Sequence, residues 1–331
     1  MKGFFKGAVF LLLFGVFLWW AELNVRDYYL RLLILFGVNS IVALGVNVTN
    51  GYSNIFSLGF GGVMLVAGYT SALLTLDPAY KAAVLRLPLW LERLQFPFPV
   101  ALALAGLLGM LASVVLLLPA FRLRGQYFIL ASMGINIVVE NLAENSRWLT
   151  NGNLGLRGIP RYTTVWWVYG ILILCLFCIY RLMRSRYGRA LVALSKDQDL
   201  AAVMGINVVR YKVMAFSIGC FISGIGASLW CHMILTINPK AFNLIYVFQI
   251  IAMLALGGIG TISGTLLGVA VVTVGSELLA PLQEGFSLMG WKVPPAFGAV
   301  NVFMAILLIV VMIKRPRGIM NGREIWEKRL S

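Results

Sequence analysis

The sequence has few charged residues and hardly any side chains that hold metals or perform covalent catalysis. Only 12% of its 331 residues are Asp, Glu, Lys or Arg, whereas a soluble domain carries about 25%. The chain contains one histidine and four cysteines. It lacks a Gly-x-x-x-x-Gly-Lys-Ser/Thr motif, which a P-loop would need to cradle nucleotide phosphates. A water-soluble fold is therefore excluded, and any energy from ATP has to come from another protein.

Charge is absent from most of the long apolar stretches. No Asp, Glu, Lys or Arg occurs in residues 56–76, 98–119, 163–180, 213–236, 246–276 or 294–313. Transporters that couple to protons or ions usually keep an acid or a base at membrane depth, so the sequence disfavours a self-contained secondary transporter. Paired carboxylates and His/Cys clusters are missing too, which disfavours a membrane-embedded enzyme.

Apolar residues make up 60% of the chain. A helix needs about 20 of them in succession to cross a bilayer. We expect an all-α, polytopic bundle with about 8–10 spans, as one transmembrane domain over residues 1–331. The candidate spans cover residues 4–20, 28–48, 56–76, 98–119, 126–143, 163–182, 213–236, 246–256, 262–280 and 294–313.

The formal net charge of +15 reflects membrane orientation. Lys and Arg concentrate in a loop over residues 184–212 and in a tail over residues 315–331. The positive-inside rule places both segments and both termini in the cytoplasm. The basic composition therefore indicates attraction to anionic lipid, with no nucleic acid as partner. We expect the first apolar run to be retained as a span, because Trp19 and Trp20 stand where a signal-peptide cleavage site would need small residues.

Two glycine-rich segments interrupt the apolar pattern, at 57–62 and 257–264. Glycine destabilises a helix interior by about 1 kcal/mol relative to alanine, and unpaired backbone groups cannot face lipid. Paired interruptions of this kind are typical of a transport pathway built from inverted repeats. Close packing of helices through small residues is the alternative.

Polar side chains inside the spans suit a pathway for a neutral or zwitterionic solute, although each could instead bond to a neighbouring helix. We expect no catalytic residue, metal site or cofactor in this chain. Cys175 and Cys178 lie in an apolar run and are expected to be buried there in the lipid, and the single histidine, His232, is expected to be a packing or interfacial residue. The candidate pathway residues are Asn47, Ser57, Gly59, Phe60, Gly61, Asn136, Gln249, Gly257, Gly258 and Asn301.

The loop over 184–212 contains the pattern of a short, well-terminated helix at 196–204. Ser195 is placed to cap it, with Gln198 in the capping-box position. Gly205 can adopt the left-handed backbone conformation that commonly ends a helix. The helix would display a small apolar face of Leu200, Ala201, Val203 and Met204, which favours docking to a partner.

At this loop the sequence resembles the LivM-like branch of the branched-chain amino acid permeases of ATP-binding-cassette importers. The resemblance extends over about residues 30–315. Its landmarks, in the order of the family, are Asn50-Gly-Tyr-Ser-Asn-Ile-Phe-Ser-Leu-Gly59, Gly68-Tyr-Thr-Ser-Ala72, Leu123-Arg-Gly-Gln-Tyr127, Gly152-Asn-Leu-Gly-Leu-Arg-Gly-Ile-Pro160, Gly188-Arg-Ala-Leu191, Gly205-Ile-Asn207, Tyr211-Lys212, Ala215-Phe216 and Leu256-Gly-Gly-Ile-Gly260.

The resemblance implies a transport subunit of the bacterial inner membrane. Its partners would be two ATPase subunits that bind ATP and Mg²⁺, a sister permease and an extracytoplasmic solute-binding protein. The loop helix would couple the permease to the ATPases. The residues assigned to this coupling are Arg189, Asp197, Asp199, Ala201, Ala202, Gly205 and Lys212.

One departure from the family pattern affects the expected solute. Members commonly have His after Ser-Leu-Gly, where this chain has Phe60, and often Gly-Gln before it, where this chain has Asn54-Ile55. Branched-chain or related amino acids are the expected solutes. Urea or short amides remain an alternative, as does a self-contained channel.

Overall fold

The computed structural model describes residues 15, 22, 24, 26–85, 87–123, 125–284, 287–288, 291–292, 298–316, 318–320 and 324, leaving out the side chains of 280–284, 287–288, 291–292, 299 and 301. The helices are α2 (Asp27–Val46), the π-helix η1 (Asn47–Tyr52), α3 (Phe60–Thr75), α4 (Pro78–Val84), α5 (Leu89–Glu92), α6 (Phe98–Leu117), η2 (Ala120–Arg122), α7 (Gln126–Asn145), α8 (Arg147–Thr150), η3 (Gly152–Leu154), α9 (Val165–Arg184), α10 (Arg186–Lys196), α11 (Gln198–Val203), α12 (Val208–Ile234), α13 (Leu244–Gly257), α14 (Ile262–Glu284) and α15 (Ala299–Lys314). The short strands β1 (Leu156–Arg157) and β2 (Thr236–Ile237) pair antiparallel, as do β3 (Ser287–Leu288) and β4 (Trp291–Lys292).

The all-α prediction is confirmed. Nine of the ten expected spans coincide with helices, and the first, at 4–20, lies outside the described residues apart from residue 15. Within the described ranges, five helices are long and apolar enough to cross a membrane, or six if α3 and α4, which meet at a bend of 115°, form one broken span. The chain is therefore a multi-pass membrane protein.

Helix α12 lies at the centre and packs against α2, α3 and α6. Its contact with α2 is close because glycines face each other there. A Cβ atom on Gly45 would lie only 2.6 Å from the carbonyl oxygen of Gly219, and a Cβ on Gly219 would approach the carbonyl oxygen of Gly45 equally. Small residues let membrane helices approach to backbone contact, and dispersion then stabilises the pair without a hydrophobic driving force.

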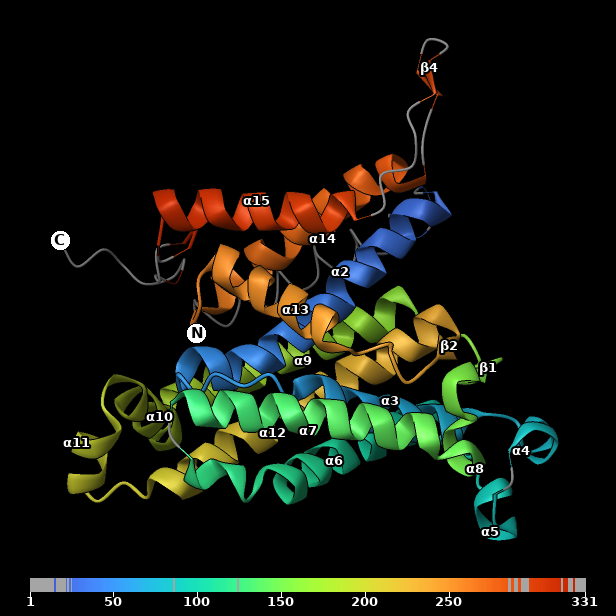
Figure 1. The fold of residues 1–331 in the computed structure, drawn as a ribbon, viewed down its shortest axis with the longest axis horizontal. Helices are drawn as coiled ribbons and strands as arrows, with labels where there is room; N and C mark the ends of the chain where they lie inside the picture. The colour runs from blue at the N-terminus through green and yellow to red at the C-terminus, as the bar shows by residue number, and fades with distance from the viewer. Residues whose placement is uncertain are drawn as a thin grey trace.

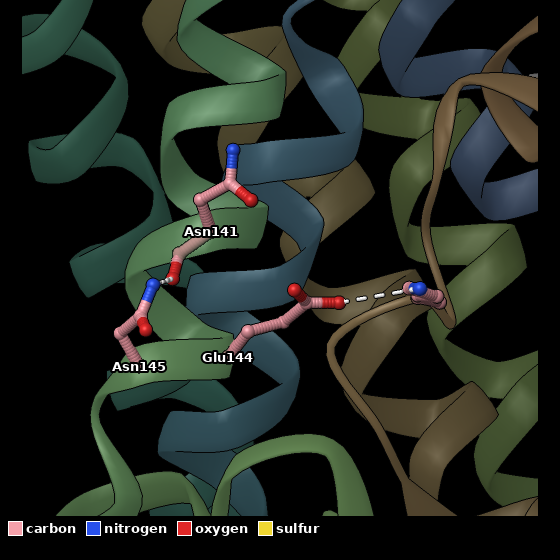
Figure 2. A network of polar contacts seen from close by, with 4 residues as sticks. Asn141, Glu144 and Asn145 are labelled. Atoms are coloured by element: carbon pink, nitrogen blue, oxygen red, sulfur yellow. Dashed lines mark hydrogen bonds and ion pairs between the residues drawn. The ribbon is translucent and has the colours of Figure 1, made fainter.

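The two ends of the bundle differ. Figure 1 shows α10 and α11 at one end and β1, β2, α4, α5 and α8 at the other. At the β1–β2 end an ion pair links α7 to the segment after β2, with 3.5 Å between the Glu144 carboxylate and Lys240 Nζ (Figure 2). Lys240 is 67% exposed, so this pair contributes little to stability.

His232 packs at the same end, as its sequence context predicted. It is completely buried, with Nε2 3.0 Å from Ser71 Oγ and Nδ1 2.9 Å from the carbonyl oxygen of Pro160. Both ring nitrogens thus have protein partners. No group of three or more His, Cys, Asp or Glu residues that could hold a metal occurs within the described part of the chain.

Candidate functional site

The second glycine-rich break lies at residues 258–261 and meets the end of α2, whereas Gly61 and Gly62 of the first predicted break lie inside α3, and the chain is interrupted just before them, at residues 53–59. Asn47 is completely buried where α2 passes into η1. Its amide oxygen accepts a hydrogen bond from Gly260 N at 2.9 Å, and its amide nitrogen donates to the carbonyl oxygen of Thr261 at 3.1 Å. Asn47 thereby satisfies backbone groups in the turn between α13 and α14, as an interruption within a membrane requires.

That turn, residues 258–261, is narrow because two of its glycines adopt conformations with positive φ. Gly258 has φ 128° and Gly260 has φ 79°, and side chains are strained in this region. Gly51 of η1 lies against the turn, since a Cβ on Gly51 would be 2.7 Å from Gly260 N. The predicted pathway residues Asn47, Gly257 and Gly258 therefore belong to one junction between α2, α13 and α14.

The first break, residues 53–59, is held by side chains from two elements. Asn50 and Ser57 bond reciprocally, with Ser57 N donating to Asn50 Oδ1 at 3.2 Å and Asn50 Nδ2 donating to the Ser57 carbonyl at 3.4 Å. The hydroxyl of Ser57 accepts from Gly59 N at 3.1 Å. Ser132 of α7 accepts from Leu58 N at 3.0 Å. The break is thus an ordered connection into α3.

Gly61 and Asn136 form a second junction, between α3 and α7. A Cβ on Gly61 would lie 2.7 Å from the amide oxygen of Asn136 and would overlap the carbonyl oxygen of Phe242. Asn136 is 1% exposed, and its Nδ2 has no hydrogen-bond partner among the described residues. An unpaired buried donor is costly, which makes Asn136 a candidate to receive a polar solute group.

Phe60, where the family commonly has His, lies in an aromatic cluster. It is completely buried and stacks on Phe216 with ring centroids 4.9 Å apart. Phe121 and Phe128 complete the cluster. The structure therefore places Phe60 in packing contact with α12.

The remaining pathway candidates lie elsewhere. Gln249 is half-buried and lines a groove of about 320 Å³ between α13 and α15. Asn301 belongs to α15, but its side chain lies outside the described residues. The ten predicted residues therefore occupy separate junctions, and their role in a pathway stays a prediction.

The loop over 184–212 folds into two helices, α10 and α11. Ser195 does not cap the second one, contrary to expectation. Its hydroxyl donates to the Val192 carbonyl within α10. Asp197 is the cap, because its carboxylate accepts from Asp199 N at 2.8 Å and from Leu200 N at 3.0 Å. Gly205 has φ 81° and ends the helix as predicted.

The apolar face of α11 is only partly as expected. Leu200, Val203 and Met204 are 65%, 84% and 82% exposed. Ala201 is wrong as a member of this exposed face, because it is buried in a small cluster with Leu191, Leu194 and Ala215. Lys212 is also buried. The other residues assigned to coupling are exposed, and they are Arg189, Asp197, Asp199, Ala202 and Gly205.

Two contributors to these junctions have no signal of their own in the sequence. Asn50 belongs to a family landmark, but no local pattern marks it as the residue that organises the first break. Glu324 accepts hydrogen bonds at the beginning of α14 from Ile262 N at 2.7 Å and from Ser263 N at 3.2 Å. Glu324 is one acidic residue in a basic tail, and no local sequence pattern shows that it hydrogen-bonds to a residue 62 positions earlier.

Comparisons with known proteins agree with this architecture. The chain matches the family described as branched-chain amino acid transport system / permease component over residues 28–313. It is similar to the high-affinity branched-chain amino acid transport system permease protein LivM of Salmonella typhimurium, with 26% identity over 85% of this chain and 67% of the relative.

In two further relatives, the alignment with this chain covers nearly the whole of the relative's own length. The probable branched-chain amino acid transport permease protein LivM of Methanocaldococcus jannaschii is 22% identical over 90% of this chain and 95% of its own. The permease protein LivH of Salmonella typhimurium is 23% identical over 86% and 92%. No solved structure matches significantly. Because the family match covers well over half of its length, this chain belongs to the branched-chain amino acid permease family.

Proposed function

We propose that the chain is the permease subunit of an ATP-binding-cassette importer for small polar or zwitterionic solutes, branched-chain or related amino acids first among them. The observation that carries the proposal is the exposed apolar face of α11, formed by Leu200, Val203 and Met204. Exposed charged residues such as Lys196 and Arg210 flank this face, so hydrocarbon cannot cover it. A partner protein can, because such patches mark interaction sites.

The contacts supply a route from this face to the breaks. Helix α10 packs on α11 and on η1. Asn54 of the first break donates to the Ser195 carbonyl at 3.5 Å. Asn47 then links η1 to the α13–α14 turn. A movement of α11 can thereby reach both interruptions, as alternating access driven by a bound ATPase requires.

The proposed assembly contains two ATPase subunits, which bind ATP and Mg²⁺, a sister permease and an extracytoplasmic solute-binding protein. The loop 184–212 and the tail 315–331 face the cytoplasm of a bacterium, and the chain lies in its inner membrane. The permease itself performs no covalent chemistry. The names of the relatives support the solute class.

We expect Val203→Asp to remove most ATP-dependent uptake. Val203 is 84% exposed, so the substitution should change folding stability by only about 0.5 kcal/mol. A charge at the centre of a docking face should cost about 2 kcal/mol of binding, and thus more than tenfold in affinity. The measurement is uptake of radiolabelled leucine, with co-purification of the ATPases as the second readout.

The matched control is Leu89→Asp, on α5 at the opposite end, where Leu89 is 71% exposed. Its co-purification with the ATPases should equal that of the wild type. Full uptake and full ATPase retention in Val203→Asp would contradict coupling through α11. Uptake of urea with exclusion of leucine would favour the amide alternative, and uptake without the ATPases would favour a channel.

Gly205→Pro should have a similar effect for a different reason. Gly205 has φ 81°, whereas proline is fixed near −65°. The variant also loses the hydrogen bond from Gly205 N to the Ala202 carbonyl. The end of α11 should therefore be displaced, and leucine uptake should fall while the protein remains in the membrane. Unchanged uptake would show that the position of this helix end is irrelevant to coupling.

A further inference from the structure

The chain beyond α15 returns to the turn between α13 and α14. Ile319 N donates to the Leu256 carbonyl at 2.9 Å, and Met320 N donates to the Gly257 carbonyl at 3.1 Å. These carbonyls belong to the last turn of α13, where no partner within the helix exists. Gly318 permits the approach, because a Cβ there would lie 2.6 Å from Gly258 Cα.

Glu324 engages the other side of the same turn. Its carboxylate accepts from Ile262 N, Ser263 N and Ser263 Oγ at 2.7, 3.2 and 2.8 Å. Tyr52 of η1 donates to the same carboxylate at 3.4 Å. An acidic group is favourable at a helix N-terminus because of the unpaired N–H groups and the helix dipole. The described part of this segment, residues 318–320 and 324, thus satisfies both ends of the interruption.

The α13–α14 turn is held by two sets of hydrogen bonds that differ in how deeply they are buried. The Asn47 side chain is fully buried inside the bundle. The opposite attachment is made by three half-buried residues, because Ile319 and Met320 donate their backbone N–H groups and Glu324 accepts with its carboxylate. Water can replace the partners of half-buried polar groups, so the second attachment can open at low cost. The Asn47 attachment cannot do so without leaving buried groups unpaired.

We propose that residues 318–320 and Glu324 form a releasable latch on the α13–α14 turn, closed in this structure and opened during each transport cycle. The latch rests on the proposed function. It predicts two separable properties. Glu324 holds the turn closed at rest, and permanent closure stops transport.

The first property is tested without solute, ATP or partners, on the full-length permease in detergent. Thr261 is 3% exposed in the turn, and Thr261→Cys introduces a thiol there. The background is Cys178→Ser, because Cys178 is the exposed native cysteine and the other three are buried. Maleimide labelling of Thr261→Cys should be slow, and adding Glu324→Gln should accelerate it at least about fivefold, the effect of roughly 1 kcal/mol.

Glu144→Gln is the matched control for this labelling. It makes the same carboxylate-to-amide change in a residue that pairs with Lys240 at the opposite end of the bundle (Figure 2). Labelling of Thr261→Cys should be unchanged in this variant. Equal labelling in Glu324→Gln and Glu144→Gln would overturn the latch, because it would show that Glu324 does not hold the turn.

The second property is tested by trapping in the reconstituted transporter. Ser263→Cys and Glu324→Cys replace two side chains that are in hydrogen-bond contact, and a short bis-methanethiosulfonate cross-linker joins them through two disulfide bonds that a thiol reductant cleaves. Uptake should fall at least tenfold after cross-linking and recover after reduction, whereas each single-cysteine variant should be insensitive. If the cross-linked and reduced forms took up solute equally, the latch would not open during transport, and the segment would only cap the turn. Uptake by the reduced form shows that the importer itself works, so a failure of the latch is distinguishable from a failure of the proposed function.

Discussion

Replacing Asn47 with leucine should abolish most transport and destabilise the permease. The variant removes the acceptor for Gly260 N and the donor to the Thr261 carbonyl. The Thr261 carbonyl keeps bonds from Thr265, so the main loss is at Gly260. Gly260 is half-buried, so leaving its N–H unpaired should cost about 1 kcal/mol, the lower end of the range for a buried donor. The measurements are thermal unfolding in detergent and leucine uptake in proteoliposomes.

Asn39→Leu is the control, because it makes the same substitution in the same continuous span, Asp27–Tyr52. Asn39 is 7% exposed, and among the described residues its amide oxygen accepts one long hydrogen bond of 3.4 Å, from Tyr246. Its replacement should lower the unfolding temperature less and leave more uptake. If the two variants were equally stable and equally active, the bridge from α2 to the α13–α14 turn would have no energetic role.

Gly268→Ala should be among the most disruptive single-methyl changes in the described part of the protein. A Cβ on Gly268 would overlap the carbonyl oxygen of Met253 and lie 2.8 Å from Gly257 N. Both neighbours are backbone atoms, so no side-chain rotation can relieve the contact. Overpacking usually costs about 1–3 kcal/mol and sometimes more, and the upper end is expected because α13 must move away from α14. Thermal unfolding of the purified permease measures the loss.

The comparison for this variant comes from glycines that face open space. For Gly134 in α7 and Gly170 in α9, no heavy atom other than the backbone of their own helix lies within 4 Å of the position that an alanine methyl group would occupy. Alanine at these helical sites should be neutral or stabilise the protein by about 0.5–1 kcal/mol. If Gly268→Ala were as stable as Gly170→Ala, the close contact between α13 and α14 would not exist in the membrane.

Local patterns were sufficient for the elements of the fold. The apolar runs correctly predicted nine helices, because the number of consecutive apolar residues needed to cross a bilayer can be counted in the sequence. The first interruption lies just before Gly61 and Gly62, which are inside α3. The second glycine cluster did locate its interruption, since glycine tolerates the positive φ found at Gly258 and Gly260. The stop at Gly205 was predictable for the same reason. The start of α11 was not, because Ser195 and Asp197 are both good caps and only the path of α10 selects Asp197.

The candidate site was less predictable because its contacts join distant residues. Ala201 belongs to an apolar face in a helical projection, yet α10 and α12 cover it. Phe60 stands at a position where a change of residue suggested a change of solute, but its ring packs on Phe216. Nothing in a linear pattern states which neighbouring helix covers a given face.

The amino-acid order was enough to predict an all-α membrane protein with two interrupted helices and a displayed loop helix. Hydrophobic length, glycine conformation and capping are local properties, so they can be read residue by residue. Helix packing was needed to show that Asn47 bridges to Gly260, 213 positions away, and that Glu324 reaches the beginning of α14. A buried backbone group requires some partner, but which side chain supplies it depends on how the helices pack.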